Sequence, residues 1–171
     1  RSAARGRGRY GIGAMPVFSF DTAVHTVRDA AAVAKGDWWW VHPLAVPRPL
    51  FAQPRPETGI EHLADEPDLA VPLRPRRLLD LLRQARRGEI DEDELPVRVT
   101  IGDAKPLPAS HVRVAGLEDL TDPKDPAPAV ADWHAMVDAV HGRIALYHSG
   151  TRVKAGDPAA VELRVGHGYG G

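Results

Sequence analysis

The spacing of the prolines is the strongest constraint on what this chain can fold into. Sixteen of its 171 residues are proline and sixteen are glycine, and five of the prolines fall within residues 43–56. Proline interrupts helices and the central strands of sheets, so long helices are expected to be scarce. We predict that residues 43–56 form an extended segment, attached to the body of the protein through Leu50 and Phe51.

Short alternating patterns of apolar and polar residues favour strands over most of the remaining chain. Residues 97–101, 112–114 and 161–165 alternate in this way, and residues 17–20 are also typical of a strand. Three adjacent tryptophans at 38–40 are too bulky for one helix face and suit a strand that is covered on both sides. We therefore predict a mainly β fold of six to eight short strands, packed like a sandwich.

One segment carries the signals of an amphipathic helix, which we place near residues 76–87. Pro75 suits the first turn, where its missing N–H costs nothing, and Gly88 suits the position after the end. Arginines gather in the last turn, where the helix dipole favours positive charge. The leucines of the apolar face are Leu78, Leu79, Leu81 and Leu82, and the arginines are Arg83, Arg86 and Arg87.

Two segments allow either a helix or strands. Residues 21–33 alternate like a strand, but their alanines and Asp21 as N-cap also suit a helix. Residues 131–148 place Trp133 and Val140 on a helical stripe, yet they also fit two strands joined by a tight turn at Gly142. The sequence leaves both choices open.

Length and charge indicate one domain and narrow the classes of partner. We expect residues 1–9, which carry four arginines, to be a flexible basic terminus or linker, and residues 10–171 to be a single β-rich domain. Twenty-two basic residues against 23 acidic ones argue against nucleic acid as a partner. The apolar runs are too short for a membrane-spanning helix, and the absence of cysteine excludes disulfides and thiolate metal sites.

No motif in the chain predicts catalysis, a cofactor or a metal. Residues 6–11 match GxGxxG, but an arginine-rich stretch precedes them where a dinucleotide site needs a strand. His134, His141 and His148 are spaced by seven, but Gly142 interrupts any helix that would align them, and no HExxH motif occurs. No GxSxG motif marks a serine nucleophile. We predict no catalytic residues, no metal ligands and no cofactor.

An acidic run at residues 89–94 directly follows the basic end of the predicted helix. It lacks the glycine and the alternating spacing of a calcium-binding loop. We expect its carboxylates to neutralise the helix arginines at the surface, where salt screens such pairs.

The best interface candidate is the tryptophan strand. Successive side chains of a strand point to opposite faces, so at least one of Trp38, Trp39 and Trp40 must point away from the main core. Together with Arg83, Arg86 and Arg87 these residues form the predicted interface of a non-catalytic interaction module. The alternative is a hydrolase or carbohydrate-binding domain whose site is assembled in space, from Glu61, His62 and His134.

Several segments of the chain, taken in order, resemble a region of large bacterial proteins encoded with phage-tail-like and contractile-injection-type gene clusters. The strings are GRYGIGAMPVFSF, PLFAQPRPETGIEHLADEPDLAVPLRPRRLLDLL, VRVTIGD, VHGRIAL and VELRVGHGYGG. That region recurs with a GRYN-type start, often ahead of a right-handed β-helix. The likeness extends from Arg9 to Gly171, and this chain departs from it at Gly11, where asparagine is usual, and in its aromatic WWWVHP strand.

The resemblance implies a β-rich structural module of a larger surface or tail-associated assembly. Its partners would be other protein subunits or a longer parent chain, and its place an extracellular or cell-surface particle of a bacterium. It implies no catalytic residue. The start at arginine and the glycine-rich end are both expected of a piece of a longer chain.

Overall fold

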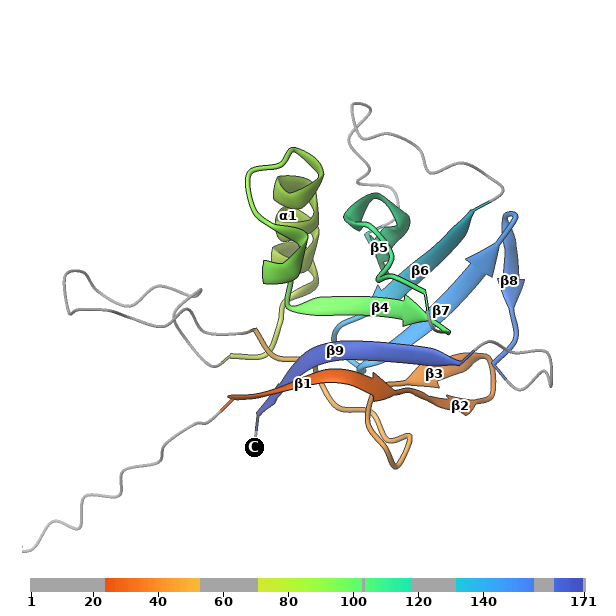
Figure 1. Cartoon of the computed structure of the whole chain (residues 1–171). Coiled ribbons are helices and arrows are strands. Elements are labelled where there is room, and N and C mark those ends of the chain that lie inside the picture. Colours follow the sequence, from red (N-terminus) through yellow and green to blue (C-terminus); the bar gives the residue numbers. More distant parts are fainter. Residues whose placement is uncertain (1–23, 53–70, 103, 118–131, 156–161, 171) are drawn as a thin grey trace, which may run out of the picture.

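Two β-sheets and one helix make up the part of the protein that the computed structural model describes, which is residues 24–52, 71–102, 104–117, 132–155 and 162–170. The three-stranded sheet crosses in front of the larger one, and the helix stands at one end (Figure 1). The strands are β1 (Val24–Ala31), β2 (Val33–Lys35), β3 (Trp38–Trp40), β4 (Val97–Ile101), β5 (Val112–Val114), β6 (Trp133–Asp138), β7 (Arg143–His148), β8 (Thr151–Val153) and β9 (Leu163–Gly170). Helix α1 spans Pro75–Arg86, and two 3₁₀ turns, η2 and η3, span Glu92–Glu94 and Ala109–His111.

The small sheet has the order β1-β9-β4, with both pairs antiparallel. Strand β9 lies in its centre, and its Leu163 and Val165 face the same side as Ile101 and Val99, their partners on β4. All four of these side chains are buried. This side of the small sheet therefore supplies one wall of the core.

The large sheet has the order β2-β3-β7-β6-β5, and β8 pairs with the second half of β7. Strands β6 and β7 form its centre as an antiparallel hairpin, whereas β5 joins β6 in parallel. The hairpin settles the choice that the sequence left open over residues 131–148. Gly142 adopts a left-handed backbone (φ 61°), which ends any continuous helix and reverses the chain.

Helix α1 covers the core at the end of the sheets where β5 lies (Figure 1). Pro75 occupies its first turn and Gly88, with φ 71°, follows its end, as the sequence predicts. Leu78, Leu79 and Leu82 are buried, whereas Leu81 is only partly buried. The prediction of a β-rich fold with one amphipathic helix is thus confirmed.

The proline-rich segment lies along the β6–β7 turn. Residues 41–44 form a turn, in which the Ala45 N–H donates to the His42 carbonyl at 2.8 Å, so the predicted extended segment begins later than Pro43, and residues 46–52 are extended. The N–H groups of Val41, Arg48 and Leu50 donate to the carbonyls of Gly142, His141 and Ala139, at 3.0, 3.2 and 2.9 Å. The Phe51 N–H donates to the carbonyl of Gly168 at 3.0 Å. Leu50 is buried and Phe51 half-buried, so the segment joins the hairpin turn to the small sheet.

Some of the other predictions agree with the structure and others differ from it. Residues 24–31 form a strand rather than a helix. The described residues alone contain nine strands, whereas six to eight were predicted for the chain, because β2 and β8 are three residues long and carry almost no pattern. In the acidic run, Glu89 lies 3.8 Å from Arg87, but Asp93 pairs with Arg98. The predictions for residues 1–20 and 53–56, and for Glu61 and His62, lie outside the described residues.

Candidate functional site

The outer face of the large sheet, which points away from the core, carries the most distinctive group of side chains. Trp39 and Ile144 are direct partners and both are buried in the core. Because side chains alternate along a strand, Trp38 and Trp40 on β3 and Arg143 on β7 point to the outer face. Trp40 is the direct cross-strand partner of Arg143.

Two guanidinium groups lie against one indole ring at this face. The guanidinium carbon of Arg143 is 4.1 Å from the centroid of the Trp38 ring, and that of Arg152 is 4.6 Å from it. Arg143 also lies 5.7 Å from the Trp40 centroid. These distances are within the range of cation–π attraction. We call Trp38, Trp40, Arg143 and Arg152 the tryptophan–arginine stack.

Asp138 holds Arg143 in the stack. Its Oδ2 accepts a hydrogen bond from Nε of Arg143 at 2.9 Å, and Nδ1 of His141 also lies 2.9 Å from this oxygen. Its Oδ1 accepts from the backbone N–H of His141. Burial raises the pKa of Asp138, but the hydrogen bonds from Arg143 and His141 outweigh burial and the net pKa is lowered. The carboxylate therefore stays charged and fixes the arginine.

This arrangement leaves the two terminal nitrogens of Arg143, Nη1 and Nη2, able to donate hydrogen bonds to a partner. Asp138 engages Nε only, and among the described residues no hydrogen-bond partner contacts its Nη1 or Nη2. The side chain is 27% exposed. Arg152 is exposed too, and its Nη2 donates to the Asp37 carbonyl at 3.0 Å. Arg143 is thus positioned by tryptophan rings and the Asp138 carboxylate, and Arg152 by the Trp38 ring and the Asp37 carbonyl, while part of each guanidinium faces solvent.

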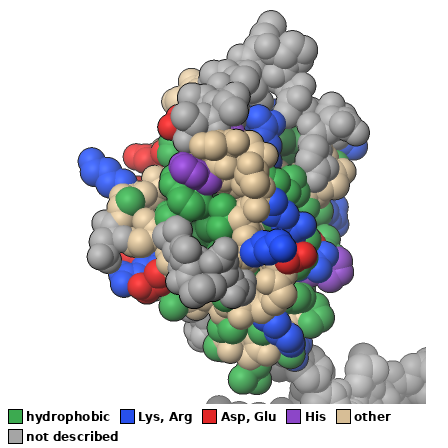
Figure 2. Space-filling view, turned by 90° about the vertical axis from the view of Figure 1, so that its right-hand side faces the viewer, with side chains coloured by type: hydrophobic (Ala, Val, Ile, Leu, Met, Phe, Trp, Pro, Cys, Tyr) green, Lys and Arg blue, Asp and Glu red, His purple; other side chains and the backbone are tan. Residues whose placement is uncertain are grey.

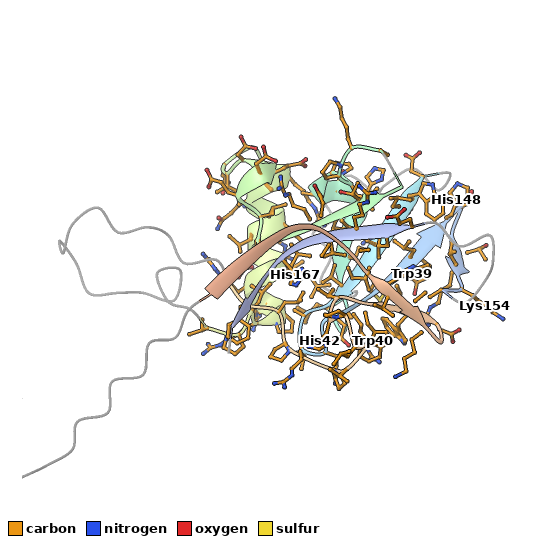
Figure 3. The ribbon with its side chains drawn as sticks, turned by 60° about the horizontal axis from the view of Figure 1, so that its bottom comes forward. Trp39, Trp40, His42, His148, Lys154 and His167 are labelled. Carbon is orange, nitrogen blue, oxygen red and sulfur yellow. The ribbon has the colours of Figure 1, made fainter. Side chains whose placement is uncertain are left out.

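Apolar side chains continue the surface next to the stack. Leu44 is 75% exposed, Val140 is 52% exposed and Val46 is also exposed; we call these three the apolar rim. The loop of Leu44 and Val46 is tied to β2 because Lys35 Nζ donates to the Ala45 carbonyl at 3.4 Å. Figure 3 shows Trp40 at the margin of the molecule near His42, with Trp39 further inside.

Two apolar side chains of the β6–β7 hairpin also face outward. Ala145 is fully buried, yet it faces outward by its register, and it is not part of the main core. Its direct partner across the hairpin, Met136, is half-buried. Ala145 and Met136 therefore add apolar area to the outer face of the hairpin.

The six residues predicted to form an interface differ in their burial and in their contacts within the protein. Trp39 is a correction: it is 1% exposed and belongs to the core, because the central residue of the three-residue strand faces inward. Arg86 binds within the protein, since its Nε and Nη2 donate to the carbonyls of Ala109 and Val112 at 3.1 and 2.8 Å. Arg83 lies 3.8 Å from Asp80.

The helix arginines and the tryptophan strand do not form one surface. Helix α1 and β3 lie at opposite ends of the molecule (Figure 1). Neither Arg143 nor Arg152 can be recognised from the sequence as part of this surface. Arg143 precedes an unbroken apolar run at residues 144–146, and Arg152 lies in a three-residue strand. Only the pairing of the strands shows which ring each arginine meets.

The described histidines do not gather into a metal site. Among the described residues, no group of three or more His, Asp or Glu side chains could hold an ion. His141 lies in the turn of the hairpin, whereas His134 and His148 lie near the open end, where the His148 ring stacks on Trp133 at 4.5 Å between centroids. His134 Nδ1 is 2.8 Å from the Asp132 carbonyl.

One buried histidine gives the stability of the fold a pH dependence. His167 on β9 is 7% exposed and pairs with Val97. Burial lowers its pKa below the ordinary value of 6.5, against a smaller opposing effect of the Val165 carbonyl. The unfolded chain therefore binds the proton more readily than the folded one.

We expect the free energy of unfolding to fall as the pH is lowered from about 6.5 toward the pKa of His167 in the folded protein. Above both pKa values the histidine is neutral in both states and has no effect. Its contribution to the slope cannot exceed about 1.4 kcal/mol per pH unit, the limit for one proton. Urea unfolding at pH 7.5, 6.5 and 5.5 measures it. His167→Gln should flatten this part of the profile, and an unchanged decline in the variant would contradict the assignment.

Comparison with known proteins identifies no relative from which a function could be inferred, so the function has to be inferred from the surface of the protein itself. No protein-family model, no curated protein and no solved structure matches this chain. Within the described residues, no helix has the length and apolar character needed to cross a membrane.

Proposed function

We propose that this chain is a non-catalytic interaction module of a larger assembly, and that it binds another protein through the tryptophan–arginine stack and the apolar rim. The observation that carries the proposal is the position of Arg143, 4.1 Å from the Trp38 ring and fixed by Asp138. A surface arginine held this way loses little conformational freedom on binding.

The composition of the surface matches the centre of protein interfaces. Tryptophan and arginine dominate binding energy at such centres, and charged residues other than arginine are depleted there. Leu44, Val46 and Val140 add exposed aliphatic area beside the stack. Aliphatic side chains of this kind find their counterparts on another protein rather than on a sugar or a nucleic acid.

The contacts of Trp38 argue against the carbohydrate-binding alternative. A sugar binds tryptophan by covering a face of the indole, but Arg143 and Arg152 already lie within 5 Å of the Trp38 centroid. A sugar would have to displace a guanidinium group from the ring. A protein partner can leave both in place and bind the rim of the stack.

The likeness to phage-tail-like and contractile-injection-type proteins supports an assembly as the context. A module within such a particle needs a surface that binds its neighbour and no reaction centre. The tryptophans and arginines of the stack, with the exposed aliphatic side chains of the apolar rim, support such a role.

The proposal predicts that assembly depends on the two outward tryptophans. The tagged chain of 171 residues has a mass of 18.5 kDa, and when it is expressed in the cells that naturally produce the protein it should sediment with much larger particles. In the double variant Trp38→Ala/Trp40→Ala, the share of the chain that sediments with the particles should fall at least about tenfold, because the centre of the interface is removed. Sedimentation of cell extracts through a sucrose gradient, followed by detection of the tag, measures this.

Two controls make the result specific. Arg76→Ala changes an exposed arginine on helix α1, away from the stack, and should leave the distribution unchanged. The far-ultraviolet circular dichroism of the double variant should match that of the wild-type protein. The proposal fails if the wild-type protein sediments alone, or if the folded double variant stays in the particles.

A further inference from the structure

The charge around the stack points to the chemistry of the partner. Lys35, Arg143, Arg152 and Lys154 lie on the strands, or directly after the strand, that carry the stack. Among the described residues of these strands and their turns, the carboxylates are those of Asp37 and Asp138. Asp138 is already paired with Arg143 and His141. Figure 2 shows basic side chains running down one half of the described surface, with few acidic groups among them. The patch is positive although the chain as a whole has a net charge of −1.

We infer that the tryptophan–arginine stack recognises carboxylate groups of an acidic protein segment, with Arg143 and Arg152 as the residues that bind them. The inference deepens the proposed function and rests on it. Its observations are the two guanidinium groups on the Trp38 ring, the engagement of Arg143 by Asp138 at Nε alone, and the excess of positive charge around them.

The geometry of Arg143 favours a carboxylate over a less directional anion. With Nε held by Asp138, the Nη1 and Nη2 groups are left to donate, and an arginine can offer two parallel N–H bonds to the two oxygens of one carboxylate. The indole ring covers part of the guanidinium and excludes water from it, which strengthens such bonds. Arg152, on the same ring, can bind a second carboxylate of the same segment.

A polypeptide is favoured over a nucleic acid as the carrier of the anionic groups. Single-stranded nucleic acid binds through bases stacked on open aromatic faces, but arginines already contact the Trp38 ring. Apolar side chains of an acidic peptide can instead pack on the apolar rim, where Leu44 is 75% exposed. One acidic peptide can then bind both the arginines of the stack and the apolar rim.

The test uses an octaglutamate peptide as the probe and the full chain as the protein. The indole N–H signals of the four tryptophans are followed by NMR during titration at low salt. We expect the Trp38 and Trp40 signals to shift and those of Trp39 and Trp133 to stay, with binding weakened by 1 M NaCl. Arg143→Gln/Arg152→Gln should weaken binding at least about tenfold, since charge-assisted hydrogen bonds are lost, and Arg76→Gln should not.

Further variants and probes keep the inference open to refutation. Arg152 is exposed, so Arg152→Gln alone should fold normally and still weaken binding several-fold. The inference is overturned if octaglutamate leaves the Trp38 signal unmoved, if the double variant binds it as well as the wild-type protein, or if octathymidylate binds more tightly. If the tryptophan variant fails to assemble but octaglutamate does not bind, the interface stands and only its acidic specificity is lost.

Discussion

Replacing Gly142 by alanine is expected to destabilise the protein by about 3–5 kcal/mol, through a clash and a strained backbone at the same residue. A Cβ atom at this position would lie 2.2 Å from the Arg48 carbonyl oxygen. That oxygen belongs to backbone tied to the turn, because the N–H groups of Arg48 and Leu50 donate to the carbonyls of His141 and Ala139. The chain cannot give way without breaking those bonds.

The backbone adds to the cost, since Gly142 has a φ of 61° and alanine is disfavoured there by roughly 1–2 kcal/mol. A loss of this size should lower the Tm by roughly 10 °C in a protein of this length. Thermal unfolding followed by circular dichroism, with urea unfolding for the free energy, gives both numbers.

Gly36 provides a matched control in the β2–β3 turn. Its φ of 64° is nearly the same, but no heavy atom lies within 4 Å of a Cβ placed there. Gly36→Ala should therefore cost only about 1 kcal/mol, the backbone part. Equal losses in the two variants would contradict the close approach of the Arg48 carbonyl to the β6–β7 turn.

The fold could be predicted where the deciding signals are local. Pro75 and Gly88 mark the ends of α1 because each fits a backbone conformation that the ends of a helix require. Alternation at residues 97–101 identified β4 because one of its faces packs on the core. At residues 131–148 the local signals conflict, because the same apolar residues fit a helical stripe and a hairpin.

The candidate site could be predicted only in part, because it depends on pairing between distant segments. The tryptophan strand and its alternation can be read from the sequence, but which of its residues face outward depends on where the core lies. The sequence does not tell that Arg143 is the partner of Trp40, or that β8 brings Arg152 to Trp38. A three-residue strand such as β8 has too few residues to show a period. The register of β3, β7 and β8 therefore decides the chemistry of the surface.

The adjacent tryptophans should differ sharply in what they contribute to stability. Trp39 is 1% exposed and belongs to the main core. Trp39→Ala would remove a large buried ring and leave a cavity, at a cost of about 3–5 kcal/mol. Trp40 is half-buried on the outer face, so Trp40→Ala should cost less than about 2 kcal/mol. Urea unfolding of both variants under one set of conditions gives the difference.

The contrast tests the orientation of the strand on which the proposed interface rests. If the register were shifted by one residue, Trp39 would face outward, and Trp38 and Trp40 would enter the core. The order of the two losses would then reverse, and Trp39 rather than Trp38 would respond to the acidic peptide. Agreement between the stability order and the NMR response would show that the ring that holds the fold together is distinct from the rings that meet the partner. Similar losses for Trp39→Ala and Trp40→Ala would contradict the placement of β3, and the proposed interface would have to be abandoned.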